Sequence, residues 1–239
     1  MLFRSARTVL AQIAADALEV PVERIAVEVG DSGFGRASVA GGSSGTASWG
    51  TAVVLACRSL REQLSAGEVP EEGLEATADT GDFLKSREQL ARYAFGAQFA
   101  DVRVDAHTGE VRVSRMLGVF AAGRIVNPRL ARSQLIGGMT MGISMALHEE
   151  SVMDAAFGDY LNKDFAQYHV AACADIESIE AHWIDESDGE LNPIGSKGIG
   201  EIGIVGTAAA VANAVHHATG VRVRDLPITL DAVLANLPP

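Results

Sequence analysis

The stretch from Asn192 to Gly206 constrains the fold of this 239-residue chain more than any other part of its sequence. It contains five glycines around one carboxylate, and an Ala-rich apolar run, residues 207–218, follows at once. Glycine allows positive φ and a close approach of backbones, whereas the apolar run is typical of a buried helix. A Gly-rich loop that opens a helix attracts anions, because the free N–H groups and the helix dipole both favour negative charge.

The carboxylate in this loop, Glu201, has three interpretations. The first is an acid at the start of a helix, where it complements the helix dipole. The second is a dinucleotide site, because Gly198, Gly200 and Gly203 spell G-x-G-x-x-G. That fingerprint follows a strand, however, and no strand pattern precedes these glycines. The third is a catalytic general base held beside an anionic cofactor.

A second loop rich in glycine and serine, residues 40–50, also leads into a predicted helix, residues 49–64. Backbone N–H groups at such a junction can hold a phosphate. The alternative is a flexible linker, which has a similar composition. The immediate passage of the loop into a helix favours the phosphate-binding interpretation.

The segment Gly195-Ser-Lys-Gly-Ile-Gly-Glu201 resembles the active-site segment of the molybdenum hydroxylases, the xanthine dehydrogenase and aldehyde oxidase family. The run Val221-Arg-Val-Arg-Asp-Leu-Pro-Ile-Thr-Leu230 is similar to the C-terminal run of that family. The resemblance extends over essentially the whole chain, but only to the C-terminal part of the family's large subunit. It is closest to bacterial aldehyde oxidoreductases of the periplasmic type.

The resemblance implies roles for individual residues. Glu201 corresponds to the family's catalytic base, and Gln134 to a glutamine that contacts the cofactor. The remaining cofactor-binding positions lie in the two glycine-rich loops: Gly42, Ser43, Ser44, Gly45, Gly198 and Gly200. We expect the two loops to face one cleft, with Gln134 on its wall. Molybdenum takes its ligands mainly from the pterin and from small inorganic groups in this family, so no residue is assigned to the metal.

The function that the resemblance implies is the cofactor-binding, catalytic portion of an oxidoreductase that hydroxylates small aldehydes to carboxylic acids. The implied cofactor is a molybdopterin-type molybdenum cofactor in its cytosine dinucleotide form. Iron–sulfur clusters and FAD would belong to partner subunits. Cys57 and Cys173 are too few for a cluster, which takes about four thiolates. The alternatives are a xanthine or N-heterocycle hydroxylase of the same family and a non-catalytic α+β fragment.

The beginning of the chain departs from the family pattern. Residues 1–5 lead into a helix pattern without a cap, and the Gly-rich cofactor segment that the family places upstream is absent. We therefore expect residues 1–5 to be non-native and residues 6–239 to form the C-terminal portion of the molybdopterin-binding domain. Two α+β lobes with a boundary near residue 85 are a further expectation. Without the N-terminal part of the large subunit, the chain is expected to be inactive alone.

Composition bears on the partners. The net charge of −12 argues against nucleic acid and against an anionic membrane surface, since both call for a basic face. No apolar run approaches the eighteen or so residues that a membrane span needs. The bacterial cytoplasm and the periplasm both remain open as compartments.

Hydrophobic periodicity predicts helices and strands without regular βαβ alternation, which indicates the α+β class. The expected helices are residues 4–19, 49–64, 128–149 and 207–218. The expected strands are residues 24–29, 91–104, 111–120 and 176–184, of which the middle two form a hairpin. In the third helix, Gly137, Gly138 and Gly142 are expected to allow another backbone to approach closely.

Overall fold

The computed structural model describes residues 2–39 and 41–237, with side chains from residue 6 onward. The chain forms two compact units whose segments alternate along the sequence. Unit 1 takes the residues up to Ala94, together with Ala121–Ala131 and Ile184–Ile199. Unit 2 takes Phe95–Phe120, Arg132–Trp183 and the residues from Gly200 onward.

The expected boundary near residue 85, between two α+β lobes, stays a prediction. The prediction of a non-native start at residues 1–5 also stays open, since Met1 lies outside the described residues.

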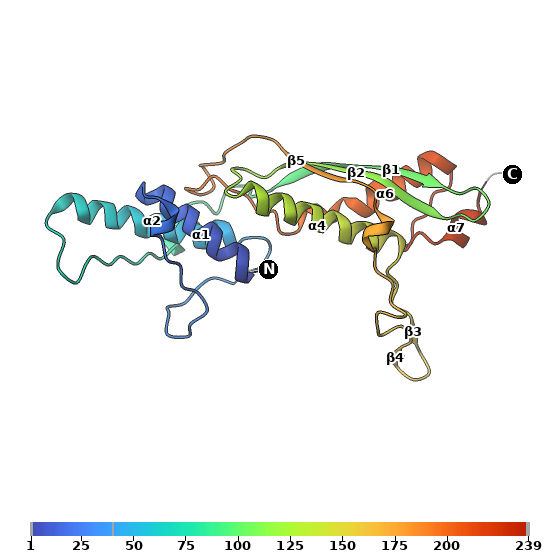
Figure 1. Cartoon of the computed structure of the whole chain (residues 1–239), viewed down its shortest axis with the longest axis horizontal. Coiled ribbons are helices and arrows are strands. Elements are labelled where there is room, and N and C mark those ends of the chain that lie inside the picture. The colour runs from blue at the N-terminus through green and yellow to red at the C-terminus, as the bar shows by residue number, and fades with distance from the viewer. Residues whose placement is uncertain (1, 40, 238–239) are drawn as a thin grey trace. The chain divides into compact units, whose positions relative to one another are not determined.

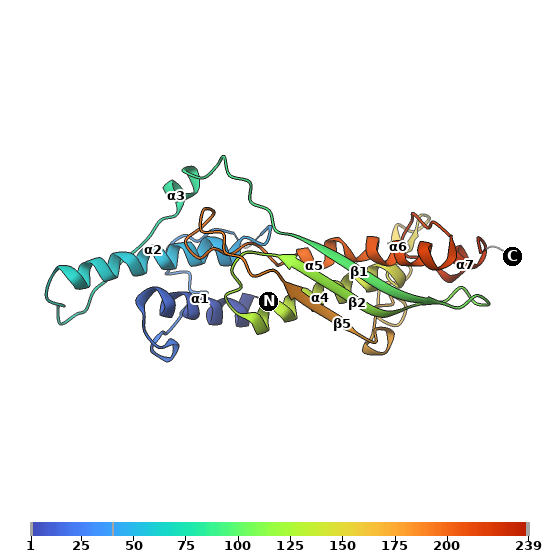
Figure 2. The ribbon, with the colours of Figure 1, turned by 90° about the horizontal axis from the view of Figure 1, so that it is seen from above.

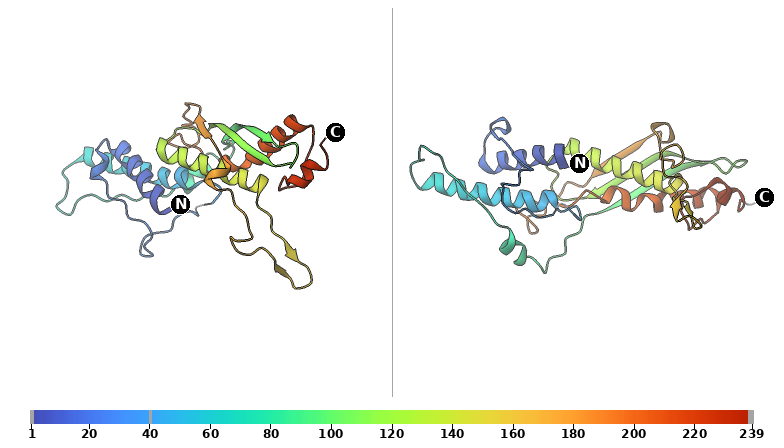
Figure 3. Two further views of the ribbon diagram at one scale, coloured as in Figure 1. Left: turned by 45° about the vertical axis from the view of Figure 1, so that its right-hand side comes forward. Right: turned by 90° about the horizontal axis from the view of Figure 1, so that it is seen from below.

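Two helices form the centre of unit 1. They are α1 (Leu2–Leu18) and α2 (Gly45–Ala66), which lie side by side (Figure 3). Ile13 of α1, Val54 of α2 and the loop residue Ile194 are buried together as a hydrophobic cluster. A Cβ atom at Gly50 would collide with the side chains of Ile13 and Ile194, so a glycine there lets the three segments meet. The short helices η1 (Val22–Arg24) and α3 (Gly81–Lys85) complete unit 1.

The strand expected at residues 24–29 is not formed. The backbone is extended after η1, with φ −100° and ψ 119° at Ile25. Ile25 and Val27 are half-buried while Ala26 and Glu28 are exposed, so the predicted alternation is present. Within the described ranges, however, no strand pairs with this segment. Alternation specifies an extended backbone, but a strand also needs a hydrogen-bonded neighbour.

A three-stranded sheet forms the centre of unit 2. The strand order is β1–β2–β5, with β1 at Phe95–Val104, β2 at Val111–Ala121 and β5 at Ile179–Trp183 (Figure 2). A short loop joins β1 to β2, closed by a hydrogen bond from Asp105 N to Glu110 O of 2.9 Å. The predicted hairpin is therefore confirmed. β5 pairs in parallel with β2, at the C-terminal part of the predicted segment 176–184.

Two long helices pack against this sheet: α6 (Thr207–Thr219) contacts β1, and Met139 of α4 (Pro128–Leu147) lies against Gly118 of β2. Large side chains from the sheet and these helices make the core: Met116, Phe120, Leu135, Met139, Ile143, Val211 and Val215. The one-turn helix α5 (Ile202–Val205) precedes α6. The combination of helices with a separate sheet confirms the α+β class.

The expected close approach of another backbone is found at Gly138, whereas the close neighbour of Gly142 is a side chain. A Cβ at Gly138 would lie 3.0 Å from the backbone of Gly203, and a Cβ at Gly142 would lie 2.5 Å from Cβ of Thr207. The expectation is wrong for Gly137, where a Cβ would meet no atom within 4 Å. Gly137 is exposed.

The remaining elements of unit 2 are short. The strands β3 (Met153–Asp154) and β4 (Asp159–Tyr160) form a small antiparallel hairpin after α4 (Figure 1). The helices η2 (Cys173–Asp175) and α7 (Leu230–Leu234) follow later in the chain. Of the helices in the described ranges, none combines the length and the apolar character that crossing a bilayer requires.

Candidate functional site

The first predicted cofactor loop leads directly into α2 in unit 1. Gly42 and Ser43 have positive φ values of 57° and 59°, and α2 begins at Gly45, four residues earlier than expected. Ser44 occupies the N-cap position, but its hydroxyl donates to Gly41 O at 2.7 Å and makes no capping hydrogen bond. The first N–H groups of a helix have no intrahelical acceptor. The start of α2 therefore has the geometry of an anion site, and its own N-cap side chain does not occupy it.

Gly198 lies against this loop. A Cβ at position 198 would stand 2.7 Å from both Cβ and the carbonyl oxygen of Ser43. Cβ atoms do not approach backbone so closely, so only glycine fits at this position. The structure thus brings together five of the predicted cofactor-binding positions in unit 1: Gly42, Ser43, Ser44, Gly45 and Gly198.

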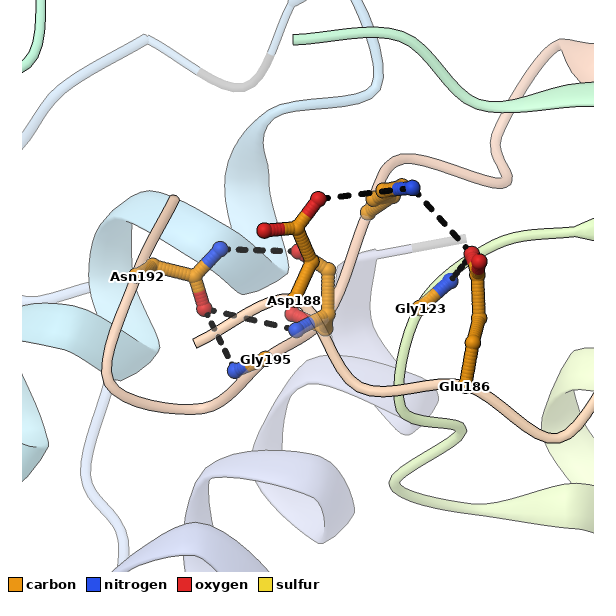
Figure 4. Close-up of polar contacts among 7 residues, drawn as sticks. Gly123, Glu186, Asp188, Asn192 and Gly195 are labelled. Atoms are coloured by element: carbon orange, nitrogen blue, oxygen red, sulfur yellow. Dashed lines mark hydrogen bonds and ion pairs between the residues drawn. The ribbon is translucent and has the colours of Figure 1, made fainter. Parts of the chain in front are cut away.

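Asn192 shapes the turn that leads to Gly198 (Figure 4). Its buried side chain accepts hydrogen bonds at Oδ1 from the N–H groups of Ile194, Gly195 and Ser196, at 3.2, 3.0 and 3.4 Å. Its Nδ2 donates to Ser196 O at 2.8 Å. An asparagine that bonds the backbone just after itself fixes a turn. The first half of the glycine-rich motif is therefore a preorganised turn.

Lys197 ties the same turn to acidic side chains. Its Nζ lies 3.2 Å from Oε1 of Glu186 and 3.4 Å from Oδ2 of Asp188, and its side chain is only 12% exposed. Gly123 N donates to Glu186 Oε1 at 2.6 Å (Figure 4). The Gly123 N–H, and then the ion pair with Lys197, hold the pKa of Glu186 below its usual value against the opposing effect of burial. Burial acts to lower the pKa of Lys197, but the bonds and charges of Glu186 and Asp188 outweigh it and raise this pKa.

Sequence reasoning missed the roles of Asn192 and Lys197. A signal was available for Asn192, because an asparagine followed at once by proline and three residues later by glycine is typical of a turn. The partners of Lys197 were less visible, since Glu186 lies eleven residues away and its other bond comes from Gly123.

Glu201 lies in unit 2, immediately before α5. It occupies the N-cap position with φ −121° and ψ −21°, and its carbonyl oxygen accepts from Ile204 N at 3.0 Å. Its side chain is exposed. The position is consistent with an acid that complements a helix dipole. However, α5 has only four residues, so few aligned peptide dipoles sum at its start.

Two glutamine side chains hold the residues on either side of Glu201. Gln134 of α4 donates from Nε2 to Gly200 O at 2.7 Å. Gln98 of β1 donates from Nε2 to Gly203 O at 2.9 Å and to Ile202 O at 3.2 Å. Gln134 was predicted as a cofactor contact, and the structure places it beside Gly200 of the motif. Gln98 was not predicted, although an amide among the helix-facing, otherwise apolar positions of a strand is a usable signal.

The predicted site residues thus fall into two groups, one in each unit. Gln134, Gly200 and Glu201 belong to unit 2. The shared cleft would involve both units and stays a prediction. In the described part of the chain, no group of three or more His, Cys, Asp or Glu side chains could hold a metal ion. A cofactor that is bound through its phosphate and pterin by backbone groups fits the residues present, because the start of α2 offers such groups.

Comparison with protein families gives one matching model, which describes a molybdopterin cofactor-binding domain. It matches residues 4–87 and 71–177, which together make up most of the chain.

Among curated proteins, the aldehyde oxidoreductase molybdenum-binding subunit PaoC of Escherichia coli K12 is 43% identical over 256 residues. This match covers 97% of the chain and 35% of PaoC, so the chain spans about a third of the length of that relative. The putative xanthine dehydrogenase molybdenum-binding subunit XdhA of the same organism is 39% identical over 136 residues, covering 57% of the chain and 18% of XdhA.

Two solved structures share the fold. The aldehyde oxidoreductase of Desulfovibrio desulfuricans ATCC 27774 superposes with a TM-score of 0.79 at 23% identity, covering 97% of this chain and 27% of that one. Quinoline 2-oxidoreductase of Pseudomonas putida 86 superposes with a TM-score of 0.78 at 24% identity, covering the whole chain and 36% of that one. At these identities the likeness establishes the fold.

Proposed function

The chain belongs to the molybdopterin cofactor-binding domain family, and from this premise we propose that it is the cofactor-binding, base-bearing portion of an oxidoreductase that hydroxylates aldehydes to carboxylic acids. The observation that carries the proposal is the start of α2, where the N-cap residue Ser44 makes no side-chain capping bond and Gly198 lies against Ser43; this geometry supports a phosphate site. The 43% sequence identity to PaoC, an aldehyde oxidoreductase subunit, supports aldehydes as the substrate class.

Unit 1 supplies the binding role in this proposal. The first N–H groups of α2, from Gly45 onward, bind the phosphate of the cofactor, and the positive φ values at Gly42 and Ser43 shape the loop around it. We assign the cofactor to the cytosine dinucleotide form. Gln134 in unit 2 adds a pterin contact, because an amide group has a second N–H and an acceptor oxygen besides the donor that bonds Gly200 O.

Unit 2 supplies the base. Glu201 is exposed at the start of α5 and can be reached by a substrate. Its carboxylate accepts the proton of the water-derived oxygen that adds to the aldehyde carbonyl carbon. When bound, the molybdenum cofactor supplies the two-electron oxidation chemistry. The protein's own part is to bind and orient the reactants and to hold the base in place.

Partner proteins complete the enzyme in this proposal. PaoC is named as a molybdenum-binding subunit and is about three times as long as the match. We infer that the chain acts with the N-terminal part of a large subunit, an iron–sulfur subunit and an FAD subunit. The isolated chain, loaded with stoichiometric molybdenum, is expected not to oxidise aldehydes with an artificial electron acceptor. Turnover under those conditions would show that it needs no other polypeptide.

The test of the proposed function is Glu201→Gln in the complete enzyme. This change keeps the size and hydrogen-bonding capacity of the side chain but removes the base. The kcat for an aromatic aldehyde should fall by about 10²–10⁴, with molybdenum content per active site unchanged. If Glu201 only complements a helix dipole, the change costs about 0.3–1 kcal/mol of stability and activity survives. A wild-type kcat in the fully loaded variant therefore contradicts the proposal.

A second candidate is hydroxylation of xanthine or another N-heterocycle, which the similarity to XdhA favours over part of the chain. The ratio of kcat/KM for an aromatic aldehyde to that for xanthine, measured on the complete enzyme, decides between the two. A non-catalytic fragment is distinguished from both by metal analysis of the complete assembly, which would then contain no molybdenum.

A further inference from the structure

We propose that Gln98 is a positioning residue for the turn that carries Glu201. The link between Gln98 and catalysis rests on the proposed function, in which Glu201 is the base. The structural claim, that Gln98 orders residues 200–207, is independent of the reaction.

The Gln98 amide is fully engaged with this turn. Its Nε2 donates to Gly203 O at 2.9 Å and to Ile202 O at 3.2 Å. Its Oε1 lies 3.1 Å from Thr207 Oγ1, whose one hydroxyl hydrogen is shared with Gly203 O at 2.9 Å. One side chain of the sheet thereby bonds α5 and the first residue of α6 together, more than a hundred residues away in the sequence.

The turn needs an external anchor because little within it is ordered by itself. α5 is a single turn of four residues, and isolated helices of that length are not stable. Gly200, Gly203 and Gly206 surround Glu201, and glycine loses more conformational freedom on folding than other residues. Without the amide of Gln98, the carbonyl groups of Ile202 and Gly203 would lose a donor in a partly buried place.

Anchors from two elements act on opposite sides of Glu201. Gln134 of α4 bonds the residue before it, Gly200, and Gln98 of β1 bonds the two residues after it. Packing adds to the second anchor, since a Cβ at Gly203 would lie 2.8 Å from Leu135 O. Glu201 is therefore the residue between two fixed points. A general base must be held at the correct place to be effective, so the order of this turn bears directly on its rate.

The first arm of the test uses the full 239-residue chain and hydrogen–deuterium exchange of residues 200–207. Gln98→Leu removes the amide and keeps much of the volume. Amide exchange at residues 202–207 should become about tenfold faster, as expected for losing bonds of this kind. The isosteric Gln98→Glu keeps an acceptor for Thr207 but lacks the donor, and it should show the same change. It also serves if Gln98→Leu fails to fold.

The control is Val233→Ala in α7, which destabilises unit 2 at a fully buried position outside the turn. Val233→Ala should leave the ratio of the amide exchange rates of residues 202–207 to those of the rest of unit 2 unchanged. Exchange at 202–207 that stays at the wild-type rate in both Gln98 variants overturns the positioning role.

The second arm uses the complete enzyme. Gln98→Leu should lower kcat about tenfold, with molybdenum content unchanged and KM within about twofold, because an aldehyde and the cofactor still bind while the base is less often in place. Val233→Ala should keep kcat per molybdenum. Faster exchange with a wild-type kcat overturns the link between turn order and catalysis. Should Glu201→Gln retain wild-type kcat, the proposed function fails, and the exchange result still decides whether Gln98 orders the turn.

Discussion

The glycine-rich motif has two halves that are anchored by different chemistry. The first half, Asn192–Gly198 in unit 1, is held by an asparagine-stabilised turn and by the ion pairs of Lys197. The second half, residues 200–207 in unit 2, is held by the neutral amides of Gln98 and Gln134. The first half lies beside the proposed phosphate site, and the second carries the proposed base.

The difference suits the two proposed tasks. Charges are tolerable beside a phosphate site when they are paired locally, and Lys197 offsets one of the two negative charges of Glu186 and Asp188. Beside a carboxylate base, a cationic anchor would favour the ionised carboxylate, lower its pKa and so make it a weaker base. An amide supplies both a donor and an acceptor without adding charge. The comparison predicts that the two halves respond differently to mutation and to pH.

The two halves can be followed separately, because each unit contains one of the two tryptophans. Trp49 lies in α2 of unit 1 and Trp183 in β5 of unit 2. In the variants Trp49→Phe and Trp183→Phe, the remaining indole reports the denaturant-induced unfolding of its own unit.

The largest effect is expected from Asn192→Ala. The buried side chain makes four hydrogen bonds to the turn, and each buried group left unsatisfied costs about 1–3 kcal/mol. Allowing for relaxation of the turn, the unfolding free energy reported by Trp49 should fall by about 3–5 kcal/mol. The signal of Trp183 should change less. An equal fall in both signals would show that the units unfold as one, which removes the basis for treating the halves separately.

The outcome of sequence-based prediction also differs between local and distant interactions. The loops that open α2 and α5 were predictable, because glycine and serine composition acts within a few residues. The long-range anchors Gln98 and Glu186 were not: Gln98 and Gly203 are 105 residues apart, and Glu186 and Gly123 are 63 apart. The strand prediction for the segment after η1 is wrong for the same reason. The alternation of Ile25 and Val27 is a local pattern, whereas a pairing strand must come from elsewhere in the chain. Tertiary partners, more than propensity, decide what the sequence leaves open.

The second-largest loss of stability is expected from Lys197→Met, which breaks the ion pairs with Glu186 and Asp188. The change keeps the aliphatic stem but leaves Glu186 and Asp188 without their cation. Hydrogen bonds to charged groups contribute about 1.5–3 kcal/mol, and the Trp49 signal should report a loss in that range at neutral pH. Lys85→Met is the control, because Lys85 is largely exposed and 4.0 Å from Asp82. It should change stability by less than about 0.5 kcal/mol.

The pH dependence sharpens the contrast between the halves. The pKa of Glu186 is lowered on folding. Its contribution to folding stability is therefore fully present above the ordinary glutamate pKa of about 4.3 and is lost as pH falls through the lower pKa of the folded state. The pKa of Lys197 is raised, so its contribution is present below about 10.4 and is lost as pH rises through the folded value. Glu186→Gln should therefore flatten the acid limb seen by Trp49. Lys197→Met should flatten it only in part, since the Gly123 N–H is the larger cause.

Packing in the second half is tested by two alanine substitutions in one helix. Gly142→Ala places a Cβ 2.5 Å from Cβ of Thr207, and overpacking of this kind costs about 1–3 kcal/mol. Gly137→Ala meets no atom within 4 Å, so better helix propensity should stabilise α4 by about 0.5–1 kcal/mol. Trp183 is the reporter for both. If both variants are stabilised, α6 does not pack against Gly142 in solution.

The smallest effect is expected at Ser196, whose buried Oγ has no hydrogen-bond partner among the residues that the structure describes. A buried hydroxyl that makes no bond loses its hydration without compensation. Ser196→Ala should therefore leave the Trp49-reported stability unchanged or raise it by up to about 1 kcal/mol.

Ser144 in unit 2 is the matched control for this substitution. It is equally buried, but its Oγ accepts a hydrogen bond from Ala171 N at 2.9 Å. Ser144→Ala leaves that N–H without its acceptor, so the Trp183-reported stability should fall by about 1 kcal/mol. A similar loss at Ser196 would mean that its hydroxyl is bonded in solution, for example to a buried water. The first half of the motif would then depend on polar contacts beyond Asn192 and Lys197, and its ionic character would be a smaller part of what separates it from the second half.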